Sequence, residues 1–119
     1  MKRYCLVNVI KQEFLDEYIE AHLNPWDELL ECLKEAGTNE ELIYMYENLA
    51  IIFLECEDID VYMEKFARSE IGKKWLVKMI PLLEDTEFTD DTGKAGDTPE
   101  GLRKVFDLKQ QLAGEFNQY

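Results

Sequence analysis

The sequence contains a single histidine, His22, and places it between two aromatic residues at helical spacing. Residues four apart are neighbours on a helix surface, so Tyr18, His22 and Trp26 would share one face. Imidazole is the side chain that ordinarily titrates near neutral pH, which makes His22 the default proton-transfer group. The alternative is a packed, hydrogen-bonded histidine on an apolar helix face, and spacing alone leaves both interpretations open.

Signatures of other chemistries are missing from the sequence. There is no glycine-rich phosphate loop, no HExxH motif and no GxSxG motif. Cys5, Cys32 and Cys56 are odd in number and lack CxxC spacing, which predicts buried free thiols and no zinc site. We therefore expect no metal and no organic cofactor. The remaining imidazole, phenol, indole and carboxylate groups suit a sugar pocket, although aromatic stripes also occur in ordinary cores.

The composition predicts one globular domain. The chain has 119 residues, of which 46% are hydrophobic. Its net charge of −13 argues against nucleic acid and anionic membranes as partners and favours a neutral or cationic one. No apolar run approaches the roughly 20 residues of a membrane span, and the first ten residues are typical of a strand rather than a signal peptide. We expect a cytoplasmic protein.

Hydrophobic periodicity predicts the elements that must position these side chains. The expected order is a strand over Arg3–Ile10, helix over 13–36, a hairpin of Leu42–Tyr46 and Leu49–Glu57, helices from about Asp58 and over Ser69–Leu83, and a strand over Leu102–Leu108. Pro25 should break the first helix near Asn24, and Gly37 should end it. Residues 84–101 form a polar, acidic loop, and 109–119 is a tail of uncertain order.

This order, β-α-β-β-α-β, predicts an α+β domain of the ferredoxin-like class over residues 1–108. The strand over Leu49–Glu57 is apolar on both faces, with Leu49, Ile51 and Phe53 on one of them. Two helices cover only one face of such a sheet. The second face must therefore pack against another copy of the chain or line a ligand cavity.

Several short motifs, taken together, resemble the L-rhamnose mutarotase family over roughly residues 1–108. They are Tyr18-x3-His22-x3-Trp26-x-Glu28-Leu29, Leu33-Lys34-x2-Gly37, Ile43-Tyr44, a strand ending at Phe53, Arg68-Ser69-x5-Trp75 and Val105-Phe106-x-Leu108. The resemblance implies a homodimeric α+β barrel in which each subunit interconverts the α and β anomers of a sugar. It implies that His22 donates and accepts the proton, that Tyr18 binds or orients the sugar, and that Trp75 lines the pocket.

Two positions depart from the family pattern. Glu41 stands where the family has a sugar-contacting tyrosine, and Leu76 stands where it has a second tryptophan. These positions bear on specificity, so the sequence does not name the sugar. Glu41 is either a hydroxyl acceptor or second base, or a solvated residue in a turn. Trp26 is either an apolar wall of the pocket or part of the core.

Three functions remain compatible with the sequence. The first is an aldose mutarotase acting on a sugar such as L-rhamnose. The second is a non-catalytic dimeric α+β barrel that binds a small polar metabolite. The third is a barrel enzyme of another type, such as a cofactor-independent oxygenase of aromatic substrates. Faster exchange between anomers would distinguish the first from the other two.

Overall fold

The computed structural model describes residues 1–84 and 106–114. Its strands are β1 (Lys2–Val9), β2 (Glu40–Tyr46) and β3 (Leu49–Cys56). Its helices are α1 (Leu15–Leu23), α2 (Asp27–Ala36), α3 (Ile59–Arg68), α4 (Glu70–Met79) and α5 (Leu108–Leu112), with short 3-10 turns η1 (Gln12–Phe14) and η2 (Ile80–Leu82).

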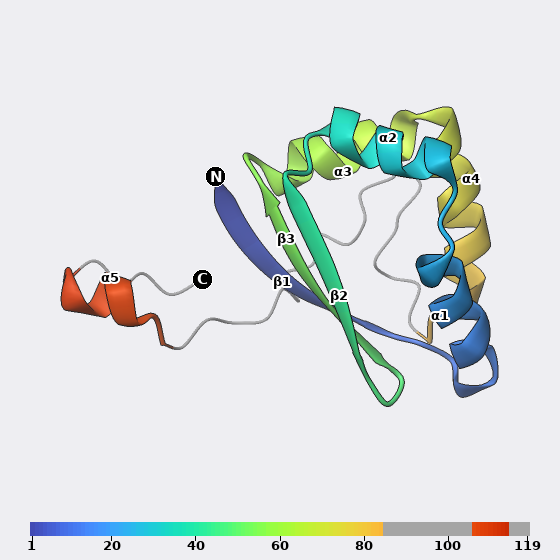
Figure 1. Ribbon diagram of the computed structural model, residues 1–119, viewed down its shortest axis with the longest axis horizontal. Coiled ribbons are helices and arrows are strands. Elements are labelled where there is room, and N and C mark those ends of the chain that lie inside the picture. Colours follow the sequence, from blue (N-terminus) through green and yellow to red (C-terminus); the bar gives the residue numbers. More distant parts are fainter. Residues whose placement is uncertain (85–105, 115–119) are drawn as a thin grey trace.

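The described strands form one antiparallel sheet in the order β1-β3-β2. The β2–β3 hairpin and the placement of β3 between β1 and β2 are the first three strands of a ferredoxin-like fold. Helices α1 to α4 form the layer beside this sheet, while α5 lies apart from them (Figure 1). The core lies between the two layers and is built from buried residues such as Ile10, Tyr18, Leu29, Leu54 and Trp75.

The predicted break in the first helical region is confirmed. Helix α1 ends at Leu23 and α2 begins at Asp27, because Asn24 leaves helical geometry ahead of Pro25. Gly37 ends α2 at a φ of 114°, a left-handed conformation that glycine adopts without a Cβ clash. The break separates α1 from α2, and the two helices lie beside different parts of the sheet (Figure 1).

Most of the predicted strand over Leu102–Leu108, and nearly all of the acidic loop 84–101, lie outside the described residues. Where the structure describes this stretch, the strand prediction is wrong. Phe106 and Asp107 are irregular, and Leu108, the last residue of the predicted strand, begins α5, which continues into the predicted tail. The physical reason is a cap: the Asp107 carboxylate accepts a hydrogen bond from the Gln110 amide at 2.9 Å, which favours a helix start.

A different segment pairs with the outer edge of β1. The predicted helix over Ser69–Leu83 ends as α4 at Met79, and Pro81 lies in the 3-10 turn that follows. The chain then bonds along the end of β1, with the Glu84 amide 2.7 Å from the Val9 carbonyl oxygen. This pairing satisfies backbone groups at the edge of the sheet where β1 ends.

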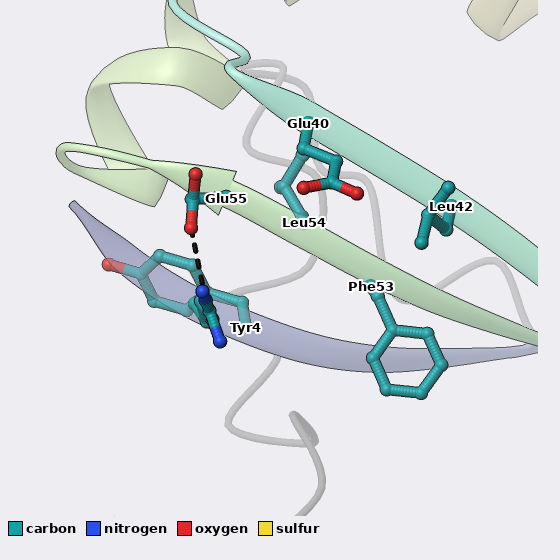
Figure 2. Close-up of a pocket in the computed structure, with 7 residues that line it drawn as sticks. Tyr4, Glu40, Leu42, Phe53, Leu54 and Glu55 are labelled. Carbon is teal, nitrogen blue, oxygen red and sulfur yellow. Dashed lines mark hydrogen bonds and ion pairs between the residues drawn. The ribbon is translucent and has the colours of Figure 1, made fainter.

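The sheet face opposite the helices is apolar. Strand alternation and register place nine apolar residues on it, here called the open sheet face: Cys5, Val7, Val9, Leu42, Tyr44, Tyr46, Leu49, Ile51 and Phe53. Arg3, Glu40 and Glu55 form a charged row at one end of the same face. Tyr44 and Tyr46 are more than half exposed, and Phe53 is 44% exposed. Figure 2 shows one end of this face, a depression of about 280 Å³ bordered by Phe53, Glu40 and the Arg3–Glu55 ion pair. No described element of the chain covers the open sheet face.

Candidate active site

A cavity of about 470 Å³ lies between the sheet and the helices. Its walls are largely aliphatic and aromatic, and they come from all three strands and from α1 to α4. Only a few side chains bring polar atoms to it: Asn8, Tyr18, His22, Glu41, Tyr62 and the indole of Trp75. A concave, mostly apolar site with a small number of polar groups is the usual form of a small-molecule site.

His22 lies on α1 with its two ring nitrogens in different situations. The Nδ1 atom is 2.8 Å from the Tyr18 carbonyl oxygen. A carbonyl only accepts, so Nδ1 carries the hydrogen and donates it, which leaves the Nε2 lone pair as a proton acceptor. Burial lowers the pKa of His22, the Lys78 ammonium lowers it further, and the bond to the carbonyl acts in the opposite direction. The imidazole is therefore a neutral base at pH 7.

Tyr18 stands one helical turn before His22, and their rings lie 4.2 Å apart. Its side chain is 3% exposed, and burial raises the pKa of Tyr18 to about 12. The Asn8 side chain opposes this shift, whereas the charge of Glu41 adds to it. The phenol is thus protonated at neutral pH and able to donate a hydrogen bond.

Trp75 and Leu76, on α4, both line the cavity. The Trp75 ring lies 5.2 Å from the His22 ring in an edge-on arrangement. Trp26 is not among the lining residues and packs against Trp75 at 5.4 Å, also edge-on. Lys78 Nζ lies 5.3 Å from the Trp26 ring centre and 6.0 Å from that of Trp75, within the range of cation–π attraction. Trp26 therefore supports the wall that Trp75 forms.

Glu41 enters the cavity from the start of β2. The Tyr62 hydroxyl on α3 donates a hydrogen bond to Glu41 Oε1 at 3.3 Å. Burial raises the pKa of the Glu41 carboxyl, and the bond from Tyr62 opposes that rise. Burial and the nearby Glu41 charge in turn raise the pKa of Tyr62, so its phenol remains a donor.

Five of the six residues predicted for the site, Tyr18, His22, Glu41, Trp75 and Leu76, line one cavity, whereas the sixth, Trp26, does not. The structure adds two polar residues that the sequence analysis did not select, Asn8 and Tyr62. The sequence could have marked Asn8 as a site residue, because it interrupts an otherwise apolar strand. It could not have marked Tyr62, since a position in a helical apolar stripe is equally typical of core packing.

Within residues 1–84 and 106–114, no group of three histidine, cysteine or acidic side chains could hold a metal ion. Cys32 and Cys56 are buried free thiols, as predicted, whereas Cys5 is a free thiol that is only partly buried. In the same part of the chain, no helix has the length and apolar character needed to cross a membrane.

Comparison with known proteins supplies the family. Residues 3–108 match the family model described as L-rhamnose mutarotase. The chain is 32% identical to an L-rhamnose mutarotase of Bacillus subtilis (strain 168) over 70% of this chain and 81% of that protein. It is 32% identical to another from Shouchella clausii (strain KSM-K16), over 73% of this chain and 84% of that protein.

A solved structure supports the fold. The crystal structure of an L-rhamnose mutarotase from Formosa agariphila superposes with a TM-score of 0.65 at 21% identity. The match covers 90% of this chain and 98% of that one. The ferredoxin-like fold predicted from the sequence is thereby confirmed. With a family model matching residues 3–108 and two curated relatives covered over most of their length, the chain belongs to the L-rhamnose mutarotase family.

Proposed function

We propose that this protein interconverts the α and β anomers of an aldose or deoxy-aldose such as L-rhamnose, by acid–base opening and closing of the sugar ring. The observation that carries the proposal is His22, a neutral imidazole that lines the cavity and whose Nε2 is left free by the bond from Nδ1 to Tyr18. The names of the two curated relatives support L-rhamnose as the first sugar to test.

In the proposed mechanism, His22 Nε2 takes the proton of the anomeric hydroxyl. The bond between the anomeric carbon and the ring oxygen breaks, giving an open-chain aldehyde and an alkoxide at the former ring oxygen. Tyr18 donates a hydrogen bond to this oxygen, and the imidazolium returns its proton there. Rotation about the adjacent carbon–carbon bond exposes the other face of the carbonyl, and the reverse steps close the ring. No proton is consumed, and no metal or organic cofactor takes part.

The remaining cavity residues would hold the sugar. Trp75 and Leu76 give apolar surface for its C–H faces, Trp26 supports Trp75 from behind, and Glu41 accepts hydrogen bonds from hydroxyls. Leu76 offers no aromatic ring to stack on the sugar, so we expect this wall of the cavity to select less strongly for sugars with a particular apolar face.

Anomer-resolved proton NMR tests the proposal. Saturation transfer between the two anomeric resonances of L-rhamnose, L-fucose and other aldoses should show faster exchange in the presence of the protein. The acceleration expected from one positioned acid–base group is about 10²–10⁴-fold. Exchange rates unchanged for every sugar would overturn the mutarotase proposal, and binding without acceleration would instead support a non-catalytic binding module.

We further propose that the protein is a cytoplasmic homodimer. Nine apolar side chains on the open sheet face have no cover in the described chain, and a second copy offers an equally apolar surface. The three free thiols are in keeping with a reducing compartment.

A charge on the middle strand of this face should separate the subunits. Phe53→Glu is expected to give a monomer in sedimentation velocity, because pairing would bury the new carboxylate without a partner. Val77→Glu is the matched control, since Val77 is 75% exposed on α4 and away from the open sheet face. A Phe53→Glu protein that sediments like the wild type would contradict this interface.

A further inference from the structure

The polar side chains of the cavity lie at two separate ends of the sheet. Asn8 shares a register position with Ala50 and Met45, whereas Glu41 pairs with Leu54. Met45 and Glu41 are four residues apart on β2, which is roughly 13 Å along the strand. Tyr18 interacts with Asn8, and Tyr62 bonds to Glu41. The proton-transfer group and the carboxylate therefore address different parts of one ligand.

The two ends nevertheless belong to one site. Both line the same cavity, and the charge of Glu41 is close enough to raise the pKa of Tyr18. The floor between them is apolar and includes Leu6, Ile43 and Ile52, which share one register position. A ring placed over this floor would present its anomeric carbon to His22 and its opposite side to Glu41.

Glu41 has unused hydrogen-bonding capacity. A carboxylate offers about four acceptor positions, and the Tyr62 hydroxyl occupies one of them. The ion pairs of the described chain, Arg3–Glu55 and Arg68–Glu64, do not include it. A half-buried carboxylate without a cation is stabilised by further donors, and a ligand in the cavity can supply them.

We propose that Glu41, positioned by Tyr62, determines the substrate specificity of this cavity by requiring a hydrogen-bond donor on a ring carbon remote from the anomeric carbon. This inference rests on the proposed function, which places the anomeric carbon at His22. The ligand group that bonds to Glu41 must carry an N–H or O–H hydrogen. It is either a hydroxyl of the sugar or an amino group that replaces one. A tyrosine at position 41 would offer a phenol, which can bind either a donor or an acceptor group of the ligand. The Glu41 carboxylate only accepts, so it selects ligands that present a donor group.

The test compares sugars with and without one ring hydroxyl, each measured with the wild type and with a variant that lacks the Glu41 carboxylate. L-rhamnose is compared with its 3-deoxy, 4-deoxy and 4-amino-4-deoxy analogues, each rate being divided by the uncatalysed rate of that sugar. We expect the wild type to disfavour one of the two deoxy sugars by roughly 10- to 100-fold in kcat/KM. Glu41→Leu should remove that discrimination, with both sugars then turned over equally slowly.

Two further variants separate the roles. Tyr62→Phe should raise KM for donor-bearing sugars and leave kcat unchanged, because a positioning residue acts on binding through Glu41. Glu41→Gln keeps an acceptor oxygen but loses the charge. If the natural donor is a hydroxyl, Glu41→Gln should keep its kcat/KM for L-rhamnose. If the natural donor is an ammonium, Glu41→Gln should lose kcat/KM selectively for the amino sugar.

Glu31→Gln, on the exposed surface of α2 and outside the cavity lining, is the matched control for the removal of one carboxylate. Thermal melting checks the fold of each variant. The proposal is overturned if Glu41→Leu slows all four sugars by the same factor, or if the wild type does not discriminate among them. If no sugar is turned over at all, the same comparison made with dissociation constants from calorimetry still tests Glu41 while the mutarotase proposal fails.

Discussion

Replacing His22 with alanine is expected to slow the exchange of sugar anomers by about 10²–10⁴-fold, the usual contribution of one general acid–base group. The loss should appear in kcat, since the imidazole acts on the reacting proton, while Trp75 and the apolar floor still bind the ring. Saturation-transfer NMR on L-rhamnose measures the effect. Added imidazole should restore part of the rate to His22→Ala, because the deletion leaves space beside the Tyr18 carbonyl oxygen, which can again accept a hydrogen bond from an imidazole nitrogen.

The same residue predicts the pH profile. Burial and the Lys78 charge lower the pKa of His22, so the neutral base persists at pH values below the ordinary imidazole value of about 6.5. The rate should be constant above that value and should fall as the pH drops through the lowered pKa, where Nε2 becomes protonated. Because His22 is the only histidine in the sequence, its ring resonances in proton NMR report this pKa directly.

Glu17→Gln, an exposed change on the same helix, is the control and should leave both the rate and the profile unchanged. Full activity in His22→Ala would show that the imidazole packs against Tyr18 and Trp75 without taking part in the reaction. A pH profile that does not follow the NMR titration of His22 would assign the proton transfer to another group.

Gly72→Ala is expected to destabilise the protein by about 3 kcal/mol, among the larger effects of a single methyl group. A Cβ on Gly72 would overlap the Phe66 carbonyl oxygen and lie 2.8 Å from its carbonyl carbon. These are backbone atoms at the junction of α3 and α4 and cannot rotate away. The Gly72 amide also bonds to Ser69 Oγ, which donates to the Phe66 carbonyl, so relief of the clash would break the cap of α4.

Thermal melting measures this effect, with a fall in the midpoint on the order of 10 °C. Lys73→Ala, at the next and exposed position of α4, is the control and should change the midpoint little, since alanine is a good helix former. Phe66 lines the cavity and Trp75 lies on α4, so Gly72→Ala should also raise KM for the sugar. A midpoint equal to that of the wild type would mean that the junction opens without cost.

Local rules made several elements predictable. The break between α1 and α2 follows from the missing amide hydrogen of Pro25, and the end of α2 follows from the freedom of Gly37. The β2–β3 hairpin follows from two β-rich runs separated by Glu47 and Asn48, and Glu47 adopts a φ of 54° in the turn. Each of these signals involves residues close in sequence.

The stretch after α4 was less predictable. Leu102, Val105, Phe106 and Leu108 give the stretch over 102–108 the apolar content of a strand. That content does not show that the Asp107 side chain can cap a helix. Likewise, the apolar pattern over Ser69–Leu83 does not show that Leu83 leaves the helix to bridge to Ile10. Both outcomes depend on which backbone partner is available, and neither partner is fixed by local periodicity.

By itself, the sequence determined which chemistry was available. A single histidine, no metal motif and an aromatic stripe at helical spacing made His22 the first candidate for acid–base catalysis, and the β-α-β-β-α-β order predicted a ferredoxin-like fold. The tertiary structure decided which side chains contact one another and which of them line the cavity. Only packing places Tyr62 of α3 against Glu41 of β2, and Trp26 behind Trp75 instead of in the cavity. Such contacts join residues distant in sequence, because helix packing on the sheet sets them, whereas local propensity acts only along the chain.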